Sequence, residues 1–371
     1  MSSSMQFVID KSELAEALSI AARAVSVRSH LPALAGVKVT ASGTTLCIES
    51  TDTEMGLRHV VPASVGHEGV SVVPARLFND VVKQMPTGEL NASTSDDGSE
   101  LLIESGEVSF KLRLLPADDF PQLPEVDGTT IQIPAAELVQ TIERVARAAS
   151  RDETRPHLTG ILMSVSGDQL KMVATDSYRL AFKTTKLSSP VAENFEANVP
   201  AKTLQEVVRL AAGVESIAVT IGERQIAFAN ERTRLVSRLV EGQFPDHEQL
   251  LPESFEHELS IDVEELLEAV KRVSLLAQKN TPLRLAFSEG ELAVSAQAAE
   301  IGEAHDRLPI TGFSGEPIEI GFNHEFLRDG LESVNTERAT LKLISAFRPG
   351  LIESDDDGKF VYLVMPIRLN V

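Results

Sequence analysis

The sequence predicts an α+β protein of three similar domains, each built from two helices packed on small antiparallel sheets. A helix-forming segment occurs three times along the chain. Each copy is followed by short runs of alternating apolar and polar residues with turn residues between them, a pattern typical of half-buried strands. The length of 371 residues also exceeds what one ordinary hydrophobic core supports, so it favours two or three domains.

The first helix of each domain is the clearest repeat. The segments IDKSELAEALSIAARAV from Ile9, IPAAELVQTIERVARAA from Ile133 and IDVEELLEAVKRVSLLA from Ile261 align without a gap. In all three, apolar residues recur with the spacing i, i+4, i+7 and i+11, which places them on one face of a helix. Asp10 and Asp262 are good N-cap residues, so we expect helices to begin directly after them.

The remaining elements follow in the same order in each repeat. Predicted hairpins begin at Gly36, Gly160 and Leu283. Second helices are predicted in VPARLFNDVVKQMP, VPAKTLQEVVRLAA and, as the weakest copy, GFNHEFLRDGLESV. Proline-rich segments close the first two repeats, which predicts domains at residues 1–127, 128–253 and 254–371.

The composition places the protein among cytoplasmic proteins. The N-terminal segment MSSSMQFVID has neither the basic nor the apolar region of a signal peptide. No window of the sequence approaches the roughly 18 apolar residues of a membrane-spanning helix. The single cysteine, Cys47, cannot form an internal disulfide, and we interpret it as a small buried apolar residue in a reducing compartment.

The net charge of −21 argues against nucleic acid as a partner, but the basic residues are not scattered evenly. Arg76 and Lys83 are seven residues apart on one predicted helix face, and Lys202 and Arg209 occupy the same places in the second repeat. The candidate DNA-facing residues are Arg23, Arg28, Arg76, Lys83, Arg144, Arg147, Arg151, Lys202, Arg209, Lys271, Arg272 and Lys279. Ordinary solvated helix faces are the alternative interpretation, and the third repeat supports it, with Glu325 and Glu332 in place of Arg76 and Lys83.

Helix packing predicts how such helices would surround DNA. Helices packed side by side lie about 9 Å apart. Six of them in a ring leave a bore of about 6 Å once a helix diameter is subtracted, and twelve leave about 23 Å. A DNA duplex is on the order of 20 Å wide, a little over twice its major-groove depth. Two chains joined head to tail are therefore expected to surround a duplex, and one chain is not.

Four short motifs, in order and inside the threefold repeat, resemble one known family. They are VATDSYRLA at residues 173–181, VPAKTLQEV, EGQFPD and the C-terminal MPIRL. Over essentially its whole length the chain resembles the bacterial sliding clamps, the beta subunits of the replicative DNA polymerase III. The resemblance implies the DNA clamp fold: half of a head-to-tail homodimeric ring with helices lining the hole and sheets outside. It also implies that the protein encircles double-stranded DNA independently of sequence and confers processivity, without a cofactor or a catalytic activity of its own.

The resemblance also implies a pocket between the second and third domains. In this family it holds short motifs, roughly Gln-x-x-Leu-Phe, of the polymerase, the clamp loader and other proteins. The matching residues here are Thr175, Ser177, Tyr178, Arg179, Leu180, Arg155, His157, Leu158, Pro245, Leu250, Asn323, Leu363, Met365, Pro366, Ile367 and Arg368. The chain departs from the family at His157 and at His247, Glu248 and Gln249, so partner preference is expected to differ.

The resemblance further implies a seam between two copies of the chain. The matching residues are Phe110, Leu112, Leu275, Leu276, Glu300 and Glu303. Phe110 also suits the core of its own domain. The segment TDSYRL could equally be a strand end, and MPIRL a last edge strand, because proline suits a sheet edge.

Two other classes of function remain to be weighed. An enzyme is disfavoured because the sequence has no HExxH, GxGxxG, GxxxxGK[ST] or GxSxG motif, and Asp176 has no evident partner as a general base. No metal site is expected. A repeat-built interaction scaffold that never surrounds DNA is the second alternative.

Overall fold

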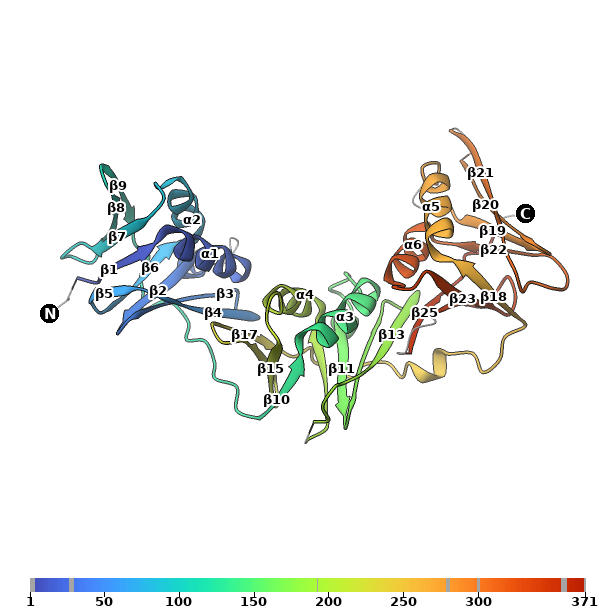
Figure 1. The fold of residues 1–371 in the computed structure, drawn as a ribbon, viewed down its shortest axis with the longest axis horizontal. Helices are drawn as coiled ribbons and strands as arrows, with labels where there is room; N and C mark the ends of the chain where they lie inside the picture. The colour runs from blue at the N-terminus through green and yellow to red at the C-terminus, as the bar shows by residue number, and fades with distance from the viewer. Residues whose placement is uncertain are drawn as a thin grey trace. The chain divides into compact units, whose positions relative to one another are not determined.

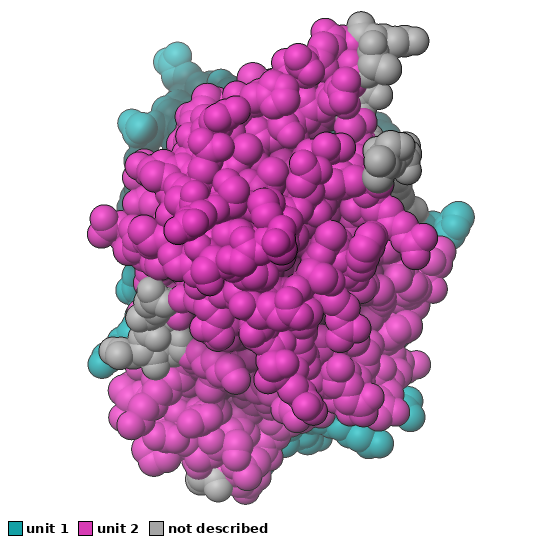
Figure 2. Space-filling view, turned by 90° about the vertical axis from the view of Figure 1, so that its right-hand side faces the viewer, with its two compact units in different colours: residues 1–132, 209–238 teal, residues 133–208, 239–371 magenta. Residues whose placement is uncertain are grey.

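The computed structural model describes residues 4–26, 30–191, 193–277, 281–298, 301–354 and 359–369. The chain forms two compact units (Figure 2): unit 1 contains residues 1–132 and 209–238, and unit 2 contains residues 133–208 and 239–371. Each unit combines parts of two sequence repeats.

Unit 1 contains two α-helices and two antiparallel sheets among its described residues. The helices α1 (Lys11–Ala21) and α2 (Ala75–Gln84) lie side by side (Figure 1). The strands are β1 (Gln6–Asp10), β2 (Gly36–Ser42), β3 (Thr45–Thr51), β4 (Met55–Pro62), β5 (Ser64–His67), β6 (Gly69–Pro74), β7 (Glu89–Thr94), β8 (Glu100–Ser105), β9 (Val108–Arg113), β10 (Thr129–Pro134), β15 (Ser216–Ile221), β16 (Gln225–Ala229) and β17 (Thr233–Arg238). They form a five-stranded sheet in the order β5-β1-β7-β8-β9 and an eight-stranded sheet in the order β10-β15-β16-β17-β4-β3-β2-β6.

Unit 2 repeats this construction. Its α-helices are α3 (Ala135–Val145), α4 (Ala201–Leu210), α5 (Val263–Ser274) and α6 (His324–Ser333), of which α5 and α6 lie side by side (Figure 1). The strands are β11 (Gly160–Ser166), β12 (Gln169–Thr175), β13 (Arg179–Lys186), β14 (Phe195–Pro200), β18 (His257–Asp262), β19 (Leu283–Ser288), β20 (Glu291–Ala298), β21 (Gly302–Pro309), β22 (Ile318–Phe322), β23 (Arg338–Leu343), β24 (Gly350–Ser354) and β25 (Phe360–Val364). They form an eight-stranded sheet in the order β14-β11-β12-β13-β25-β24-β23-β18 and a four-stranded sheet in the order β21-β20-β19-β22.

The helix starts agree with the predicted capping residues. Asp10 accepts a hydrogen bond from the amide of Ser12 (2.8 Å), and Asp262 accepts one from the amide of Glu265 (3.0 Å). These caps satisfy amides that have no partner within the helix. The apolar face of α1 is buried at Leu14 and Leu18, as its spacing predicts.

One core cluster of unit 1 joins both of its sheets to the helices. Phe7 of β1, Leu18 of α1, Ile48 of β3, Phe78 of α2 and Ile103 of β8 all belong to it and are almost completely buried. Burial of one large apolar side chain contributes about 1.5–3 kcal/mol, so this shared core holds the helices on the sheets.

Two strand pairs connect segments that the sequence repeats assign to different domains. In unit 1, β4 pairs with β17, with Leu57 opposite Leu235; we call this pair the first joint. In unit 2, β13 pairs with β25, with Ala181 opposite Tyr362; we call this pair the second joint. The small antiparallel sheets predicted from the sequence are present, and at each joint two groups of four strands merge into one sheet of eight.

The two joints have the same register. Gly56 lies opposite Thr51 in the first repeat, and Leu180 lies opposite Thr175 in the second, so Gly56 and Leu180 are equivalent positions. Gly56 pairs across the first joint with Val236, and Leu180 pairs across the second with Leu363. Each joint therefore connects the fourth strand of one repeat to the last strand of the next repeat in the same way.

Two corresponding strands remain at sheet edges. The strand β9, the last of the first repeat, ends the five-stranded sheet, and β21, the fourth of the third repeat, ends the four-stranded sheet. They are the counterparts of the strands that pair at the joints. In the ranges described, no helix is both long and apolar enough to cross a membrane.

Candidate peptide-binding site

A cavity of about 320 Å³ opens beside the second joint in unit 2. Four segments build its wall: the turn between β12 and β13, the segment after the short 3-10 helix η5 (Glu248–Leu250), the turn between β23 and β24, and the end of β25. The lining residues are Thr175, Ser177, Arg179, Leu180, Gln249, Leu250, Leu251, Pro252, Phe347, Arg348, Pro349, Leu363 and Met365.

The floor of the cavity is apolar. Leu180 and Leu363 lie opposite each other across the second joint, and both are buried. They belong to a cluster that also contains Val173, Phe182 and Val361. Such a floor suits aliphatic and aromatic side chains of a ligand, because their burial drives binding in pockets of this kind.

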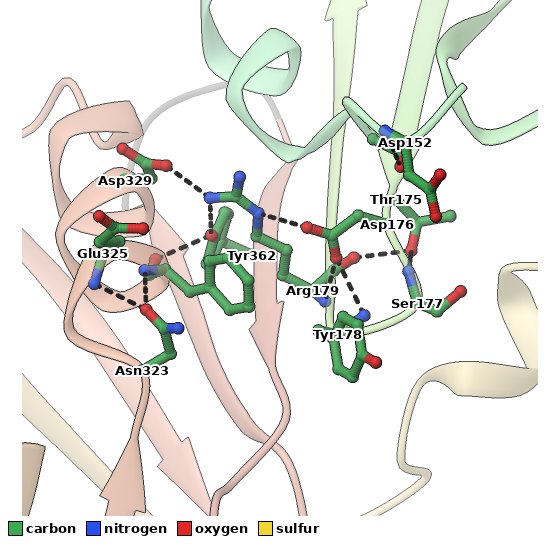
Figure 3. A network of polar contacts seen from close by, with 12 residues as sticks. Asp152, Thr175, Asp176, Ser177, Tyr178, Arg179, Asn323, Glu325, Asp329 and Tyr362 are labelled. Atoms are coloured by element: carbon green, nitrogen blue, oxygen red, sulfur yellow. Dashed lines mark hydrogen bonds and ion pairs between the residues drawn. The ribbon is translucent and has the colours of Figure 1, made fainter. Parts of the chain in front are cut away.

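The turn of residues 175–179 forms the polar rim and is fixed by its own side chains (Figure 3). The hydroxyl of Thr175 donates to the carbonyl of Arg179 (2.6 Å) and accepts from the amide of Ser177 (3.2 Å). Asp176 Oδ1 accepts from the amides of Tyr178 (2.9 Å) and Arg179 (3.0 Å). Short polar side chains commonly stabilise tight turns by such local bonds, and here they hold Ser177 at a φ of +78°.

The guanidinium of Arg179 leads from this rim into a buried network (Figure 3). Arg179 is only 7% exposed. Its Nε donates to Asp176 Oδ2 (3.0 Å), and its Nη1 donates to Asp329 Oδ2 (2.6 Å) and to the hydroxyl of Tyr362 (3.3 Å). The guanidinium also lies 4.4 Å from the centre of the Phe326 ring. Charge-assisted bonds of this kind are about twice as strong as neutral ones, so the network ties the rim to α6.

The network also determines the protonation of its members. Burial opposes the charge of Arg179, but Tyr362, Asp329 and Asp176 together raise the pKa of its guanidinium above the ordinary value. Burial raises the pKa of the Tyr362 phenol, and the charge of Arg179 only partly opposes this effect. Tyr362 is therefore a neutral hydroxyl that donates to the carbonyl of Phe326 (2.8 Å).

Several predicted pocket residues line the cavity and others do not. Those that line it are Thr175, Ser177, Arg179, Leu180, Leu250, Leu363 and Met365. Those outside its lining are Tyr178, Arg155, His157, Leu158, Pro245, Asn323, Pro366, Ile367 and Arg368. Leu158 is buried and lies outside the lining, so its predicted place beside the pocket stays a prediction.

Three of the predicted residues outside the lining contact the rim or the helix beside it. Arg155 donates to the hydroxyl of Ser177 (3.2 Å), and the ring of Tyr178 stacks on Phe326 with centres 6.4 Å apart. Asn323 caps α6 by accepting from the amides of Glu325 and Phe326. Met365 donates its amide to the carbonyl of Tyr178 (2.9 Å), so the chain continues along the rim beyond β25.

The residues that depart from the family at the cavity are fixed by neighbours. Burial lowers the pKa of His247, and the nearby Lys171 lowers it further. Glu248 pairs with Lys171 at 3.3 Å, and Gln249 donates to Asp246 at 2.7 Å. These contacts hold the segment that carries Leu250 against the cavity.

Sequence reasoning missed one side of the cavity. Phe347, Arg348 and Pro349 form it from the turn between β23 and β24, and Phe347 is 75% exposed at the rim. No motif marks these residues. A phenylalanine close to the turn-forming residues Pro349 and Gly350 was the one sign that could have pointed to an exposed aromatic side chain.

Most candidate DNA-facing residues are exposed, but one is not. Arg144 is 4% exposed: its Nη1 donates to the carbonyl of Ser333 (2.8 Å), and its guanidinium lies over the ring of Phe360. The prediction that Arg144 faces DNA is therefore wrong. The exposed candidates are Arg23, Arg76, Lys83, Arg147, Arg151, Lys202, Arg209, Lys271 and Arg272.

Some of these exposed cations have acidic neighbours. Arg147 Nη1 lies 2.9 Å from Glu332 and 3.6 Å from Asp329, and Arg272 pairs with Asp306 at 2.7 Å. Arg28 and Lys279 lie outside the described residues. The candidates therefore differ in how readily they could bind a phosphate.

The candidate seam residues lie on or near the two edge strands. On β9, Phe110 is 37% exposed, which excludes the alternative of a core position, whereas Leu112 is buried. Leu275 follows α5 and is 85% exposed, and Leu276 next to it is half-buried. Glu303 lies on β21. Glu300 is outside the described residues.

The described residues contain no group of three or more histidine, cysteine or acidic side chains that could hold a metal ion.

The cavity beside the second joint offers a ligand an apolar floor, a fixed polar rim and a flanking aromatic residue.

Comparisons with known proteins match the whole chain to one family. Residues 5–124, 132–246 and 248–368 match the N-terminal, central and C-terminal domains of the DNA polymerase III beta subunit. The beta sliding clamp of Streptomyces coelicolor is 33% identical, over 99% of this chain and 100% of the relative. The crystal structure of the DNA polymerase sliding clamp from Bacillus subtilis has a TM-score of 0.94 at 29% identity, covering 99% of this chain and 100% of that one. A sliding clamp from Pseudomonas aeruginosa bound to griselimycin has a TM-score of 0.91 at 30% identity, with 99% and 100% coverage.

Proposed function

The chain belongs to the family of DNA polymerase III beta subunits, the beta sliding clamps, and we propose that two copies of it close head to tail into a ring around duplex DNA. As a member of this family it is a non-catalytic processivity subunit. The ring would tether the replicative polymerase and other replication and repair proteins to DNA without reading its sequence.

The observation that carries the head-to-tail proposal is the order of strands in the sheets. Each joint pairs the fourth strand of one repeat with the last strand of the next repeat. Only β21 and β9 of this series lack such a partner in the described part of the chain. If β9 of one copy pairs with β21 of another, the two edges form a third joint of the same kind. An edge strand that is covered in this way is no longer open to unspecific pairing.

The shared register of the joints predicts which residues meet at the third joint. Phe110 of one copy would lie opposite Ala304 of the other, and Lys111 opposite Glu303. Opposite charges directly across an antiparallel pair stabilise it. Repeated contacts between two different surfaces form a closed ring only if the rotation from each copy to the next brings the last copy back to the first. We infer that two copies close the ring, because the helix-packing estimate requires twelve helices to surround a duplex.

We infer that the exposed basic residues of the helices and their 3-10 extensions contact the DNA backbone weakly. Phosphate contacts by Lys and Arg are sensitive to salt. Weak contacts suit a protein that must slide, because the ring and not the affinity would prevent loss of DNA. The net charge of −21 is compatible with this function, since acidic residues elsewhere repel other nucleic acids.

The cavity beside the second joint supports binding of short peptides. Its apolar floor suits the Leu and Phe of a Gln-x-x-Leu-Phe motif, and Thr175 and Arg179 line its polar side. The griselimycin complex of the Pseudomonas aeruginosa clamp supports a ligand site in this family. We infer that the partners are the replicative polymerase, the clamp loader and other proteins that carry such a motif.

The domains that we propose are residues 1–127, 128–253 and 254–371. The family matches and the proline-rich segments support these limits, whereas the compact units divide the chain differently because each joint merges strands from two domains. We place the protein in the cytoplasm, where bacterial replication occurs, and its function requires no cofactor.

Sedimentation and DNA retention test the ring. We expect a dimer of about twice the chain mass of 40.2 kDa. After loading by a clamp loader, it should remain on a circular plasmid and be lost once the plasmid is linearised. Equal loss from both forms would contradict encirclement, and a stable monomer at micromolar concentration would contradict the head-to-tail dimer. Intact peptide binding with no retention on either DNA would instead favour an interaction scaffold.

A truncation tests the pocket separately. Deletion of residues 365–371 removes Met365 from the cavity and the chain that follows it along the rim. We expect peptide binding to be lost and the dimer to persist, because β9 and β21 are unchanged. Unaltered peptide affinity would place the binding site elsewhere.

A further inference from the structure

The side chain of Asp329 lies outside the cavity but contacts a residue that lines it. Asp329 belongs to α6, and its Oδ2 accepts from Nη1 of Arg179 at 2.6 Å. Arg179 lines the cavity, whereas Asp329 does not. A carboxylate beneath the wall of a binding site does not touch the ligand, and its most direct route to the ligand is the residue that it holds.

The turn at the rim does not require Arg179, because the first repeat contains the same turn without an arginine. Asp52 Oδ1 accepts from the amide of Met55 (2.8 Å), and the hydroxyl of Thr51 donates to the carbonyl of Met55 (2.9 Å). Thr53 has the same φ of +78° as Ser177. Met55 occupies the position of Arg179, so the guanidinium and its contacts with α6 serve a purpose other than folding the turn.

The contacts of Arg179 fix the direction of its guanidinium. Asp176 holds one edge, and Asp329 and Tyr362 hold Nη1 (Figure 3). The ring of Phe326 supports the flat face. Without Asp329, one of the two carboxylates that anchor the guanidinium would be lost. The long side chain of Arg179 would then regain rotamers beside the apolar slot, and ligand binding would have to order it again. The conformational entropy lost in that step would weaken binding.

We propose that Asp329 is a positioning residue for the peptide site, which holds the guanidinium of Arg179 against α6 and out of the apolar slot. This inference rests on the proposed peptide-binding function of the cavity. It assigns to α6 an indirect contribution to ligand affinity, because Asp329 would not itself contact the ligand.

A second acidic residue of α6 provides a matched control. Glu332 lies one turn further along the helix and pairs with Arg147 at 2.9 Å. Asp329 also contacts Arg147, at 3.6 Å. Loss of Glu332 therefore removes a carboxylate from the same helix while leaving the bond between Asp329 and Arg179 in place.

Fluorescence anisotropy of a labelled peptide, Gln-Ala-Asp-Leu-Phe, bound to the full-length protein tests the proposal. We expect Asp329→Ala to weaken binding about tenfold, the loss typical of one charge-assisted hydrogen bond. Asp329→Glu should restore most of the affinity, because it keeps a carboxylate that can reach Arg179. Glu332→Ala should change the affinity less than twofold, within the usual range for a surface ion pair.

A double-mutant cycle with Arg179→Met distinguishes positioning from a general effect on stability. Met is tolerated at the equivalent position of the first repeat, so this variant should fold. In the Arg179→Met background, Asp329→Ala should change peptide affinity less than twofold, because the residue through which it acts is gone.

The two tyrosines of the chain provide a spectroscopic measure of the same network. The chain has no tryptophan, and both tyrosines, Tyr178 and Tyr362, lie at this site. We expect Asp329→Ala to change the near-ultraviolet circular dichroism of Tyr362, recorded in a Tyr178→Phe background, and Glu332→Ala to leave it unchanged.

Three results would overturn the proposal. Asp329→Ala could leave peptide affinity unchanged while the protein remains folded by far-ultraviolet circular dichroism. It could also weaken binding equally in the wild-type and Arg179→Met backgrounds, which would mean that it acts by another route. Failure of the wild-type protein to bind the peptide would overturn the pocket assignment, and with it this inference.

Discussion

The first and second joints have the same strand order and register, but on one face of the sheet the side chains are charged at the first joint and apolar at the second. Four equivalent positions form a row across the strands at each joint. The first joint row consists of Lys38, Glu49, Arg58 and Arg234. The second joint row consists of Leu162, Val173, Phe182 and Val361. A charged row and an apolar row therefore support the same arrangement of strands.

Each cation of the first joint row pairs with a glutamate. Glu49 is buried and pairs with Lys38 and with Arg58, each at 2.9 Å. Glu125, from the segment that follows the first repeat, pairs with Arg58 at 3.2 Å and with Arg234 at 3.4 Å. This segment is thereby held across the first joint.

That segment also fills the place that corresponds to the floor of the cavity. A Cβ atom added to Gly56 would lie only 2.4 Å from Leu123, so the side chain of Leu123 covers the position equivalent to Leu180. At the second joint, Leu180 forms an open floor with Leu363. The comparison shows that the same strand pairing forms both joints, whereas the residues on one face decide whether a cavity stays open beside the joint.

The largest expected effect comes from placing a charge in the apolar row. Phe182→Arg introduces at the second joint the residue found at the equivalent position of the first, but without a glutamate beside it. We expect a loss of about 3–5 kcal/mol in the free energy of unfolding, because the new charge is buried and unpaired. Lys171 and Lys359 already lie over the Phe182 ring and would add repulsion. Urea unfolding measures the loss.

A compensating change sharpens this test. Val173→Glu together with Phe182→Arg rebuilds the Glu49–Arg58 pair at the second joint and should recover part of the lost stability. Phe182→Leu, as a control, should cost no more than about 1.5 kcal/mol, since it keeps an apolar side chain of similar volume. If the free energy of unfolding of Phe182→Arg lies within 1 kcal/mol of the wild-type value, the apolar row does not determine the stability of the second joint.

The next largest effect is expected at the proposed third joint between two copies. Lys111→Glu would place a carboxylate opposite Glu303 and should raise the dissociation constant of the dimer about tenfold. Glu303→Lys should have the same effect, and the two changes together should restore the dimer because the pair is then reversed. Sedimentation over a range of concentrations measures the constants. Independent, additive effects of the two changes would show that these residues do not meet.

A smaller effect is expected when the charged row loses its central carboxylate. Glu49→Gln leaves Lys38 and Arg58 without their shared partner, but both cations are partly exposed and can be hydrated. We therefore expect a loss of about 1 kcal/mol in the free energy of unfolding, much less than for a fully buried pair. Peptide affinity should not change, because Glu49 belongs to unit 1 and the cavity to unit 2. A drop in affinity would mean that the chemistry of the two joints is coupled.

Local sequence patterns predicted the helices and hairpins because these depend on contacts close in the chain. The capped start at Asp10 and the buried spacing of Leu14 and Leu18 are examples. The joints were not predicted, since the pairing of β4 with β17 or of β13 with β25 connects residues more than 170 positions apart. Nothing in either strand alone specifies its partner.

The error at Arg144 has a similar physical origin. Arg144, Arg147 and Arg151 were all predicted to face DNA, but α3 ends at Val145 and continues as the 3-10 helix η3 (Ala146–Ala148). The guanidinium of Arg144 binds the carbonyl of Ser333 at the C-terminal end of α6, a contact between distant segments that local spacing does not specify. The pocket residues in TDSYRL were found through the family resemblance, whereas Phe347 lies in a turn that carries no motif.

The smallest expected effect concerns a histidine that distinguishes the joints in their response to pH. His59 at the first joint accepts or donates a hydrogen bond with Thr233 at 2.7 Å, and the second joint has Lys183 at the equivalent position. Burial lowers the pKa of His59 below its ordinary value of 6.5, and Arg232 lowers it further, against the opposing effects of Glu16 and Glu13. The folded state thus favours the neutral ring, so the contribution of His59 to stability is complete above pH 6.5 and decreases as the pH falls below it. Urea midpoints recorded from pH 8 to pH 5 should decrease more steeply for the wild type than for His59→Gln, and identical slopes would contradict a buried neutral histidine at the first joint.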